Sequence, residues 1–152
     1  MQYPSIFDSS TTEMVLSRLE KLQPETQPEW GKMDAAQMLA HLNVAYDQAY
    51  GTGTVKYNPL MKLMLKLFVK KIVVGPKPYK RNSRTAPSFL IADARDFEKE
   101  KAKLIDHVRT TEGKGRKYFE GKASAGFGKL TSGEWNILFY KHLDHHFTQF
   151  GL

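Results

Sequence analysis

The sequence predicts an all-α fold in a single domain, and three observations support this. Apolar residues recur three and four positions apart in four or five segments. Most of these segments begin at a capping residue or end at glycine or proline, and none shows the sustained alternation of a half-buried strand. The 152 residues fit one domain, which we place at 1–152, with long irregular connections between its helices.

The first two predicted helices have clear boundaries. The first follows DSSTTE, where Ser9 or Ser10 can cap it, and ends before Pro24. The loop QPETQPEWGK comes next, because its prolines and glycine disfavour a helix. The second helix opens with DAAQ, in which Asp34 and Gln37 can form a capping box, and it continues to about Tyr50, where GTGT ends it.

The third predicted helix covers residues 60–74 and is unusually apolar. Asn58 can cap it and Pro59 suits its first position. Eleven of its fifteen residues are apolar and the other four are Lys62, Lys66, Lys70 and Lys71. It is shorter than the roughly 20 residues of a membrane-spanning helix. We favour burial within a bundle, or partly in a homodimer interface, over the alternative that the four lysines hold this helix on an acidic membrane surface.

Two more helices are predicted towards the C-terminus. The irregular stretch GPKPYKRNSRTAPS precedes a helix at about 93–110, on whose polar face His107 is expected to be a surface residue. A linker rich in glycine and lysine follows. In TSGE, Thr131 and Glu134 can form a capping box, and WNILFYKHLDHHFTQF then reads as the last helix.

Composition limits the classes of function. The absence of cysteine from the sequence excludes disulfides, thiolate metal sites and cysteine nucleophiles. The net charge of +7 indicates a solvated basic surface rather than a specific nucleic-acid site, because no aromatic residues alternate with the basic ones. The N-terminus lacks the pattern of a secretory signal, and we expect a cytoplasmic protein without a transmembrane segment.

Histidines concentrate in the last predicted helix. His142 and His146 are four residues apart and therefore share a helical face. His145 lies to one side of them, and Gln149 falls within the same arc. Two imidazoles at this spacing can bind one divalent metal ion, but a third ligand is needed from elsewhere.

His41 is the candidate for that third ligand. It lies in DAAQMLAHLNVAY, on the face of the second helix that carries Met38 and Ala45, with Gln37 one turn earlier. Three neutral imidazoles would hold a divalent ion and leave one coordination position open, as catalytic sites do. The alternative is that each histidine is a hydrogen-bonded core residue and that no metal binds.

Two stretches resemble a known family. WGKMDAAQMLAHLNVAY and FGKLTSGEWNILFYKHLDHHFTQFG resemble the DinB/YfiT-like metalloenzyme superfamily, in particular a bacterial branch of uncharacterised members. The resemblance implies a four-helix bundle with up-down-down-up connections. It also implies a metal site, for zinc, nickel or a similar divalent ion, formed by His41, His142 and His146.

The resemblance further implies a metal-dependent enzyme, since relatives of known activity look like transferases or isomerases that use low-molecular-weight thiols. An open position on a divalent ion can activate water or a thiol, so we expect either a hydrolase or a thiol transferase. His145, Gln37 and Gln149 are candidates for hydrogen bonds that orient the ligands. The catalytic residues stay unassigned, because no carboxylate is placed as a general base. The basic loop at 77–84 could receive a small anionic substrate such as a thiol that carries carboxylates. The alternative function is a non-catalytic, stress-response bundle that binds a metal or a small molecule.

Overall fold

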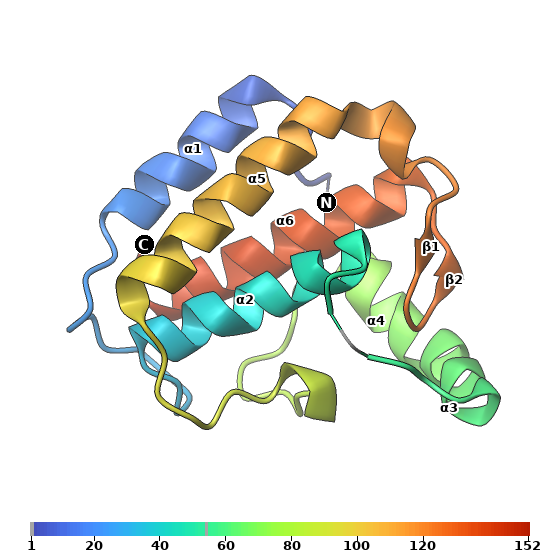
Figure 1. The fold of residues 1–152 in the computed structure, drawn as a ribbon, viewed down its shortest axis with the longest axis horizontal. Helices are drawn as coiled ribbons and strands as arrows, with labels where there is room; N and C mark the ends of the chain where they lie inside the picture. Colours follow the sequence, from blue (N-terminus) through green and yellow to red (C-terminus); the bar gives the residue numbers. More distant parts are fainter. Residues whose placement is uncertain (1, 54) are drawn as a thin grey trace.

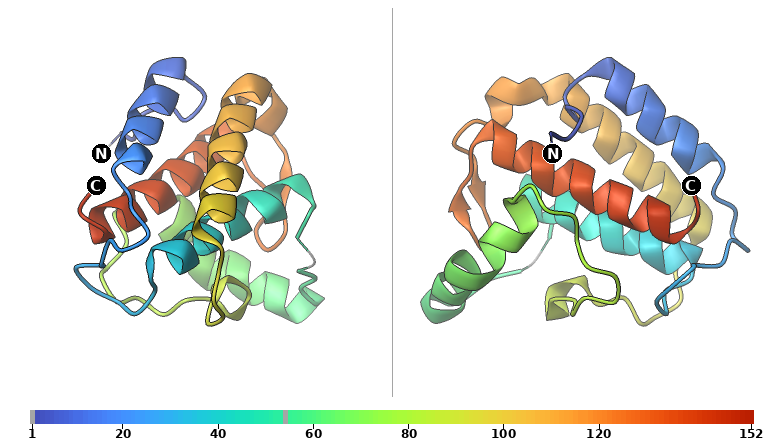
Figure 2. Two further views of the ribbon diagram at one scale, coloured as in Figure 1. Left: turned by 60° about the vertical axis from the view of Figure 1, so that its left-hand side comes forward. Right: turned by 180° about the vertical axis from the view of Figure 1, so that it is seen from behind.

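The computed structural model describes residues 2–53 and 55–152, and it is mostly helical, as predicted (Figure 1). Four long helices form the body of the molecule: α1 (Ser9–Glu20), α2 (Ala35–Tyr50), α5 (Phe97–Phe119) and α6 (Ser132–Gln149). The two views in Figure 2 show that α1 and α6 run in one direction and that α2 and α5 run in the other. α2 and α6 therefore lie side by side and antiparallel, which lets residues from the middle of each helix meet.

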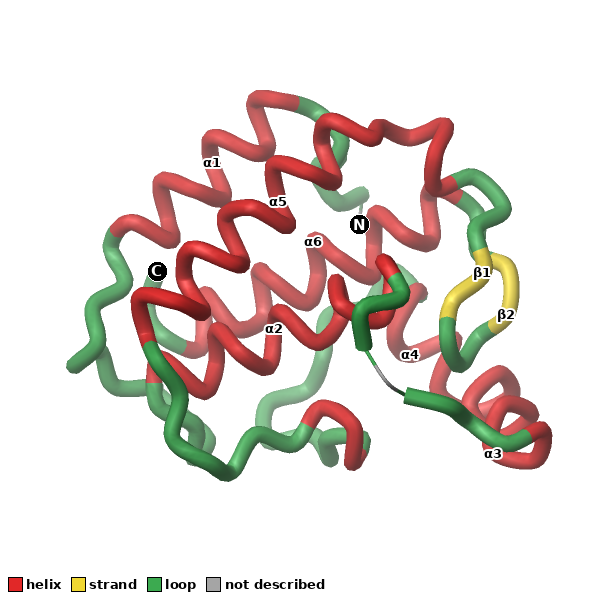
Figure 3. Tube along the Cα trace, viewed as in Figure 1, coloured by secondary structure: helices red, strands yellow, loops and turns green. Residues whose placement is uncertain are grey.

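Strand structure among the described residues is confined to one small hairpin (Figure 3). β1 (Ala123–Ser124) pairs antiparallel with β2 (Gly128–Lys129), just before α6 begins. A short 3-10 turn, η2 (Pro87–Phe89), interrupts the long connection between α4 (Lys70–Val74) and α5. Both features lie in stretches that the sequence predicts to be irregular.

The predicted capping boxes explain where two of the long helices begin. The Asp34 side chain accepts from the backbone N–H of Gln37, whose side chain accepts from the N–H of Asp34. Thr131 and Glu134 make the same reciprocal pair at the start of α6. Such a cap stabilises a helix by about 1 kcal/mol. The cap predicted for α1 is wrong, because Asp8 holds the cap position without a side-chain hydrogen bond.

Aromatic rings from α2 and α6 stack through the centre of the core. The Tyr46 ring lies parallel to that of Phe139, with centroids 4.5 Å apart, and Phe139 stacks on Trp135 at 5.4 Å. All three side chains are almost fully buried. Rings of this size contribute much of the apolar area removed from water, so they fix the spacing of α2 and α6 around the histidines.

α5 is longer than predicted. The sequence predicts an end near Thr110 because Gly113 and Gly115 follow, but helical structure continues to Phe119. Gly115 adopts a left-handed conformation, with φ of 71°, and the chain kinks there and then resumes its helical course. The kink turns the last residues of α5 back onto the core, where Phe119 is fully buried.

The predicted third helix is an arm that projects from the body (Figures 1 and 2). It consists of α3 (Pro59–Met64), the π-helical turn η1 (Leu65–Val69) and α4 (Lys70–Val74). The expectation that it is buried within a bundle is wrong, because α3 and η1 contain no buried residue. The apolar faces of the four long helices already cover one another. The arm therefore contacts the body mainly near its C-terminal end, and Leu65 in its middle lies against Gly126 of the hairpin. No helix in the described ranges is long and apolar enough to cross a bilayer.

Lys141 holds that end of the arm on α6. Its side chain is buried, and its Nζ donates to the carbonyl oxygens of Ile72 and Gly75 at 2.7 Å and of Lys77 at 3.2 Å. The last carbonyls of a helix lack partners within the helix, so the ammonium group caps α4 from outside. Burial lowers the pKa of Lys141 to about 8, because desolvation disfavours the charged form.

We expect Lys141→Met to lower the free energy of unfolding by about 2 kcal/mol, because three carbonyls lose a charged donor while the apolar stem is kept. Denaturant titration measures this, and faster amide exchange in α4 would locate the loss. As a control, Lys117→Met on the exposed side of α5 should change stability by less than about 0.5 kcal/mol. Equal stability of the two variants would contradict the anchoring role.

Candidate metal centre

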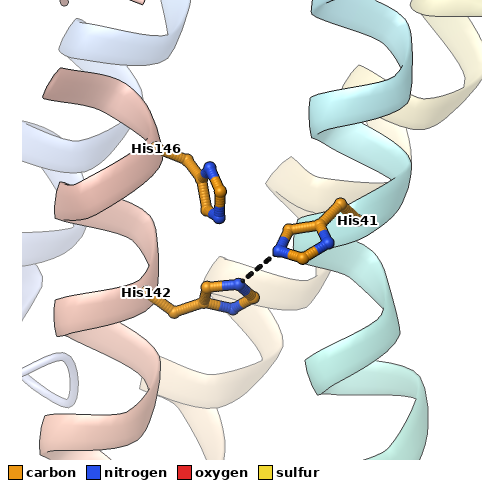
Figure 4. Close-up of side chains that lie close together, drawn as sticks. All are labelled: His41, His142 and His146. Atoms are coloured by element: carbon orange, nitrogen blue, oxygen red, sulfur yellow. Dashed lines mark hydrogen bonds between the residues drawn. The ribbon is translucent and has the colours of Figure 1, made fainter. Parts of the chain in front are cut away.

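Three histidines meet between α2 and α6. His41 comes from the middle of α2, and His142 and His146 come from successive turns of α6 (Figure 4). One potential ligand nitrogen from each ring lies within 4.8 Å of the others. His41 and His146 are buried, and His142 is largely buried as well. The fold thus brings together the three side chains that the sequence singles out as metal ligands.

The His41 ring is oriented by the connection that precedes α5. Its Nδ1–H donates to the carbonyl oxygen of Phe89 at 2.8 Å, and the Phe89 ring packs edge-on against the imidazole. Sequence analysis does not identify Phe89, because a backbone carbonyl leaves no signature in residue type. Its place in a long irregular connection was the only available signal. With Nδ1 engaged, Nε2 of neutral His41 carries a lone pair directed at α6.

The His146 ring is oriented by a relay through Gln149. Nδ1 of His146 lies 2.7 Å from Oε1 of Gln149, and Nε2 of Gln149 donates to the carbonyl oxygen of Trp30 at 2.6 Å. Because the amide nitrogen must be the donor to Trp30, the amide oxygen is left to accept from His146. His146 is therefore protonated at Nδ1, and its Nε2 lone pair also faces the cluster.

His142 completes the cluster through a short contact with His41. The two Nε2 atoms are 2.8 Å apart, and since that of His41 is an acceptor, His142 must donate the proton between them. This proton occupies the position from which a metal ion would bind both nitrogens. A divalent ion held by the three rings would take the place of this proton.

Burial keeps all three rings neutral at pH 7. Desolvation is the largest cause of the lowered pKa in each case, and it brings the pKa of His146 to about 3 and that of His142 well below its ordinary value. The hydrogen bond to Phe89 opposes this effect at His41, whose pKa is lowered nonetheless. Neutral imidazole is the form that binds metal ions, so the pocket holds its donors in the required protonation state.

His145 lies beside this cluster, next to aromatic side chains. Its ring centroid is 5.0 Å from that of His146, 5.5 Å from Tyr79 and 5.9 Å from Trp30. Desolvation lowers its pKa, and the nearby Asp144 opposes this shift. His145 is therefore a half-buried neutral base at the edge of the site. It is outside the group of three that can share one ion.

Other residues that drew attention in the sequence have different positions. Gln37 closes its capping box and donates to the carbonyl oxygen of Asp93, so its hydrogen bonds are not to the histidine rings. The prediction of a surface position for His107 is wrong. Its side chain is 12% exposed, hydrogen-bonds to Asp47 at 3.2 Å and stacks on Tyr46. Of the basic loop 77–84, Arg81 reaches the site region and lies 4.0 Å above the Trp30 ring.

A glycine lies against the relay that orients His146. Gly31 follows Trp30 and adopts a left-handed φ of 86°. A Cβ atom at this position would come within 2.5 Å of Nε2 of Gln149. The close approach places the Trp30 carbonyl oxygen where the amide can reach it. A residue with no direct contact to the histidines thus helps to set the orientation of one of them.

The donor set fits a divalent metal ion. Two of the three rings are fixed by hydrogen bonds at Nδ1 and direct Nε2 inward, which is the arrangement found around histidine-bound metals. Imidazole nitrogen suits zinc, nickel, copper and iron, so the donors do not select among these ions.

Comparison with known proteins adds a family to this geometry. A family model described as a protein of unknown function, DUF1569, matches residues 6–151. The chain belongs to the DUF1569 family. No curated protein and no solved structure matches it. The match covers all three clustered histidines of this DUF1569 protein, together with every long helix and the arm.

The buried histidines should make the metal-free DUF1569 protein acid-sensitive. An unfolded histidine binds a proton below its ordinary pKa of 6.5, whereas His146 in the folded chain does so only near pH 3. The contribution of the neutral His146 ring to the free energy of unfolding is therefore fully present above about pH 6.5. This contribution is lost progressively as the pH drops below that value. For His146 alone, we expect a loss of about 2 kcal/mol between pH 7 and pH 5.

Guanidinium unfolding of chelator-treated protein at several pH values measures this loss. His146→Gln, which does not titrate in this range, should show a shallower dependence by about the contribution of one group. A variant slope identical to that of the parent protein would show that the His146 imidazole is not held neutral in the fold.

Proposed function

We propose that this DUF1569 protein is a divalent-metal protein of the DinB/YfiT type, in which His41, His142 and His146 bind zinc or nickel. The observation that carries the proposal is the outward hydrogen bonding of two ring Nδ1 atoms, which directs two Nε2 lone pairs to one point. A histidine that is only a hydrogen-bonded core residue has no need to direct its Nε2 lone pair at the same point as another histidine. The antiparallel course of the four long helices supports an up-down-down-up bundle.

We further propose that the metal site is catalytic. A structural zinc site is normally closed by a fourth protein ligand. In the described parts of the chain, the group that can share one ion contains three histidines. This feature favours an enzyme over the alternative of a non-catalytic metal- or small-molecule-binding module.

The proposed reaction is hydrolysis or transfer of a low-molecular-weight thiol. A divalent ion at this position would lower the pKa of a water or thiol bound beside it and thus supply a nucleophile near neutral pH. The chain itself would orient the ligands through Phe89 and Gln149 and would restrict solvent with Tyr79 and Trp30. His145 is neutral at pH 7, and its ring centroid is 5.0 Å from that of His146. It would accept the proton that the water or thiol releases. Arg81 supplies positive charge for an anionic part of the substrate.

Metal binding is tested with two histidine variants. The parent protein should bind one zinc or nickel ion per chain, and His142→Ala should lower the affinity at least a hundredfold because one of three ligands is lost. His107→Ala is the matched control, since that ring is also partly buried but hydrogen-bonds to Asp47 and is outside the group that can share one ion. Titration calorimetry on untagged protein gives the affinities, and circular dichroism checks folding. Equal affinity in all three proteins would exclude this ligand set.

Turnover is tested by following the loss of an electrophile or an activated ester, with and without small thiols. Activity should require added zinc or nickel, should be lost in His142→Ala and should be retained in His107→Ala. Dependence on a thiol would favour the transferase, and activity without thiol would favour the hydrolase. A loaded protein that binds the metal but accelerates none of these reactions would instead support the binding module.

A further inference from the structure

The arm (residues 59–74) exposes an apolar surface that the body of the molecule does not cover. Seven of the ten large apolar side chains that are exposed in the described residues belong to it, with exposures from 47% to 70%. They are Leu60, Met61, Leu63, Met64, Leu67, Phe68 and Ile72. A contiguous exposed patch of this kind marks a surface that contacts another molecule or a membrane.

These side chains form rows on one side of the arm. Leu60, Met64, Phe68 and Ile72 follow one another at four-residue intervals, so they lie along one face of a helical segment. The opposite side faces the body, where Val74 is buried and Val69 and Val73 are half-buried. The outer row therefore makes no contribution to the core, and its exposure needs a different explanation.

The charged residues of the segment that contains the arm are all positive. Residues 48–92, which include the arm and the connection after it, contain nine lysines and arginines and no aspartate or glutamate. The nine positive charges of this segment exceed the net charge of +7 of the whole chain, so the remaining residues together carry a small net negative charge. In the arm, Lys62, Lys66 and Lys71 are exposed, whereas Lys70 forms an ion pair with Glu134 at 3.0 Å.

The positive charge favours one of two candidate partners for the apolar face, a second copy of the chain or an acidic surface. A second copy of the chain would bring two uniformly basic segments together, and the like charges would repel. An acidic surface is complementary. The arm is also a convex projection rather than a groove, and the ion pair with Glu134 and the cap from Lys141 hold it in this position (Figures 1 and 2). Such a shape can enter a fluid interface without a matching cavity in a partner.

We propose that the arm is a peripheral membrane-binding element for bilayers rich in anionic phospholipid. Its outer apolar row would enter the boundary between headgroups and acyl chains, while the exposed lysines extend to the phosphates. Weak apolar insertion and electrostatic attraction are each marginal alone and together give stable but reversible binding. This inference does not depend on the metal, so His142→Ala should bind membranes as the parent protein does.

Co-sedimentation with vesicles tests the proposal. The full chain should sediment with vesicles of phosphatidylcholine and phosphatidylglycerol in equal parts, should stay in solution with phosphatidylcholine alone, and should be released by high salt. Lys62→Gln/Lys66→Gln should weaken binding by about fivefold for each lysine. Leu67→Ser/Phe68→Ser should weaken it at least about tenfold, because both side chains leave the apolar face.

The matched control is Lys21→Gln/Lys99→Gln, which changes the net charge equally at exposed positions away from the arm and should alter binding by at most about twofold. An equal loss in the control would assign binding to net charge and overturn the proposal. Failure to sediment with the anionic vesicles at low salt would also overturn it and would leave an acidic protein as the partner. The proposal would also be overturned if light scattering showed a dimer that Phe68→Ser dissociates and the parent protein did not bind vesicles.

Discussion

Burial of uncharged imidazole between α2 and α6 is the constraint on which the site depends. An imidazole taken out of water loses its charge and must satisfy its remaining N–H group. The chain meets this requirement at His41 with the carbonyl of Phe89 and at His146 with the amide of Gln149. Because both bonds are made at Nδ1, both Nε2 lone pairs are left for the cluster, where that of His41 accepts from His142. The need to satisfy buried polar atoms thus produces a shared set of donors.

The same requirement ties distant parts of the chain to the site. The Phe89 carbonyl belongs to the connection before α5, and the Trp30 carbonyl belongs to the loop before α2. Stacking of Tyr46 on Phe139 sets the distance between the two helices that supply the histidines. The connections that appear irregular are therefore part of the site, since without them the imidazoles would have no fixed tautomer or orientation.

Much of this arrangement could be predicted from local sequence. Helix starts could be predicted at the capping boxes of Asp34 and Thr131, because the hydrogen bonds of each box lie within four residues. The start at Pro59 could be predicted because proline suits the first helical position. The shared face of His142 and His146 follows from helical spacing alone. The interpretation of Gln37 as a neighbour of the ligands rested on the same spacing, but its amide is engaged in the capping box and with Asp93, and no hydrogen bond joins it to the rings in the part of the chain that the structure describes.

The features that sequence analysis missed depend on contacts between distant segments. Nothing in the residue type of Phe89 reveals that its carbonyl bonds to His41. The apolar composition of residues 60–74 led to a prediction of burial. That prediction was wrong because composition carries no information on whether space remains in the core. The end predicted for α5 near Thr110 relied on two glycines, but a helix can resume after a left-handed residue when the turn beyond it finds a place in the core, as Phe119 does.

The close approach of Gly31 to Gln149 means that a Cβ atom at position 31 would displace the end of the Gln149 side chain, and the left-handed φ of 86° would add strain for another residue. Even alanine would push the amide away from the Trp30 carbonyl. The carboxamide would then be free to rotate and present its NH₂ group to Nδ1 of His146, which would favour the opposite tautomer and turn the lone pair away from the neighbouring rings. A methyl group in a surface loop would in this way reverse the donor character of a buried nitrogen on another helix.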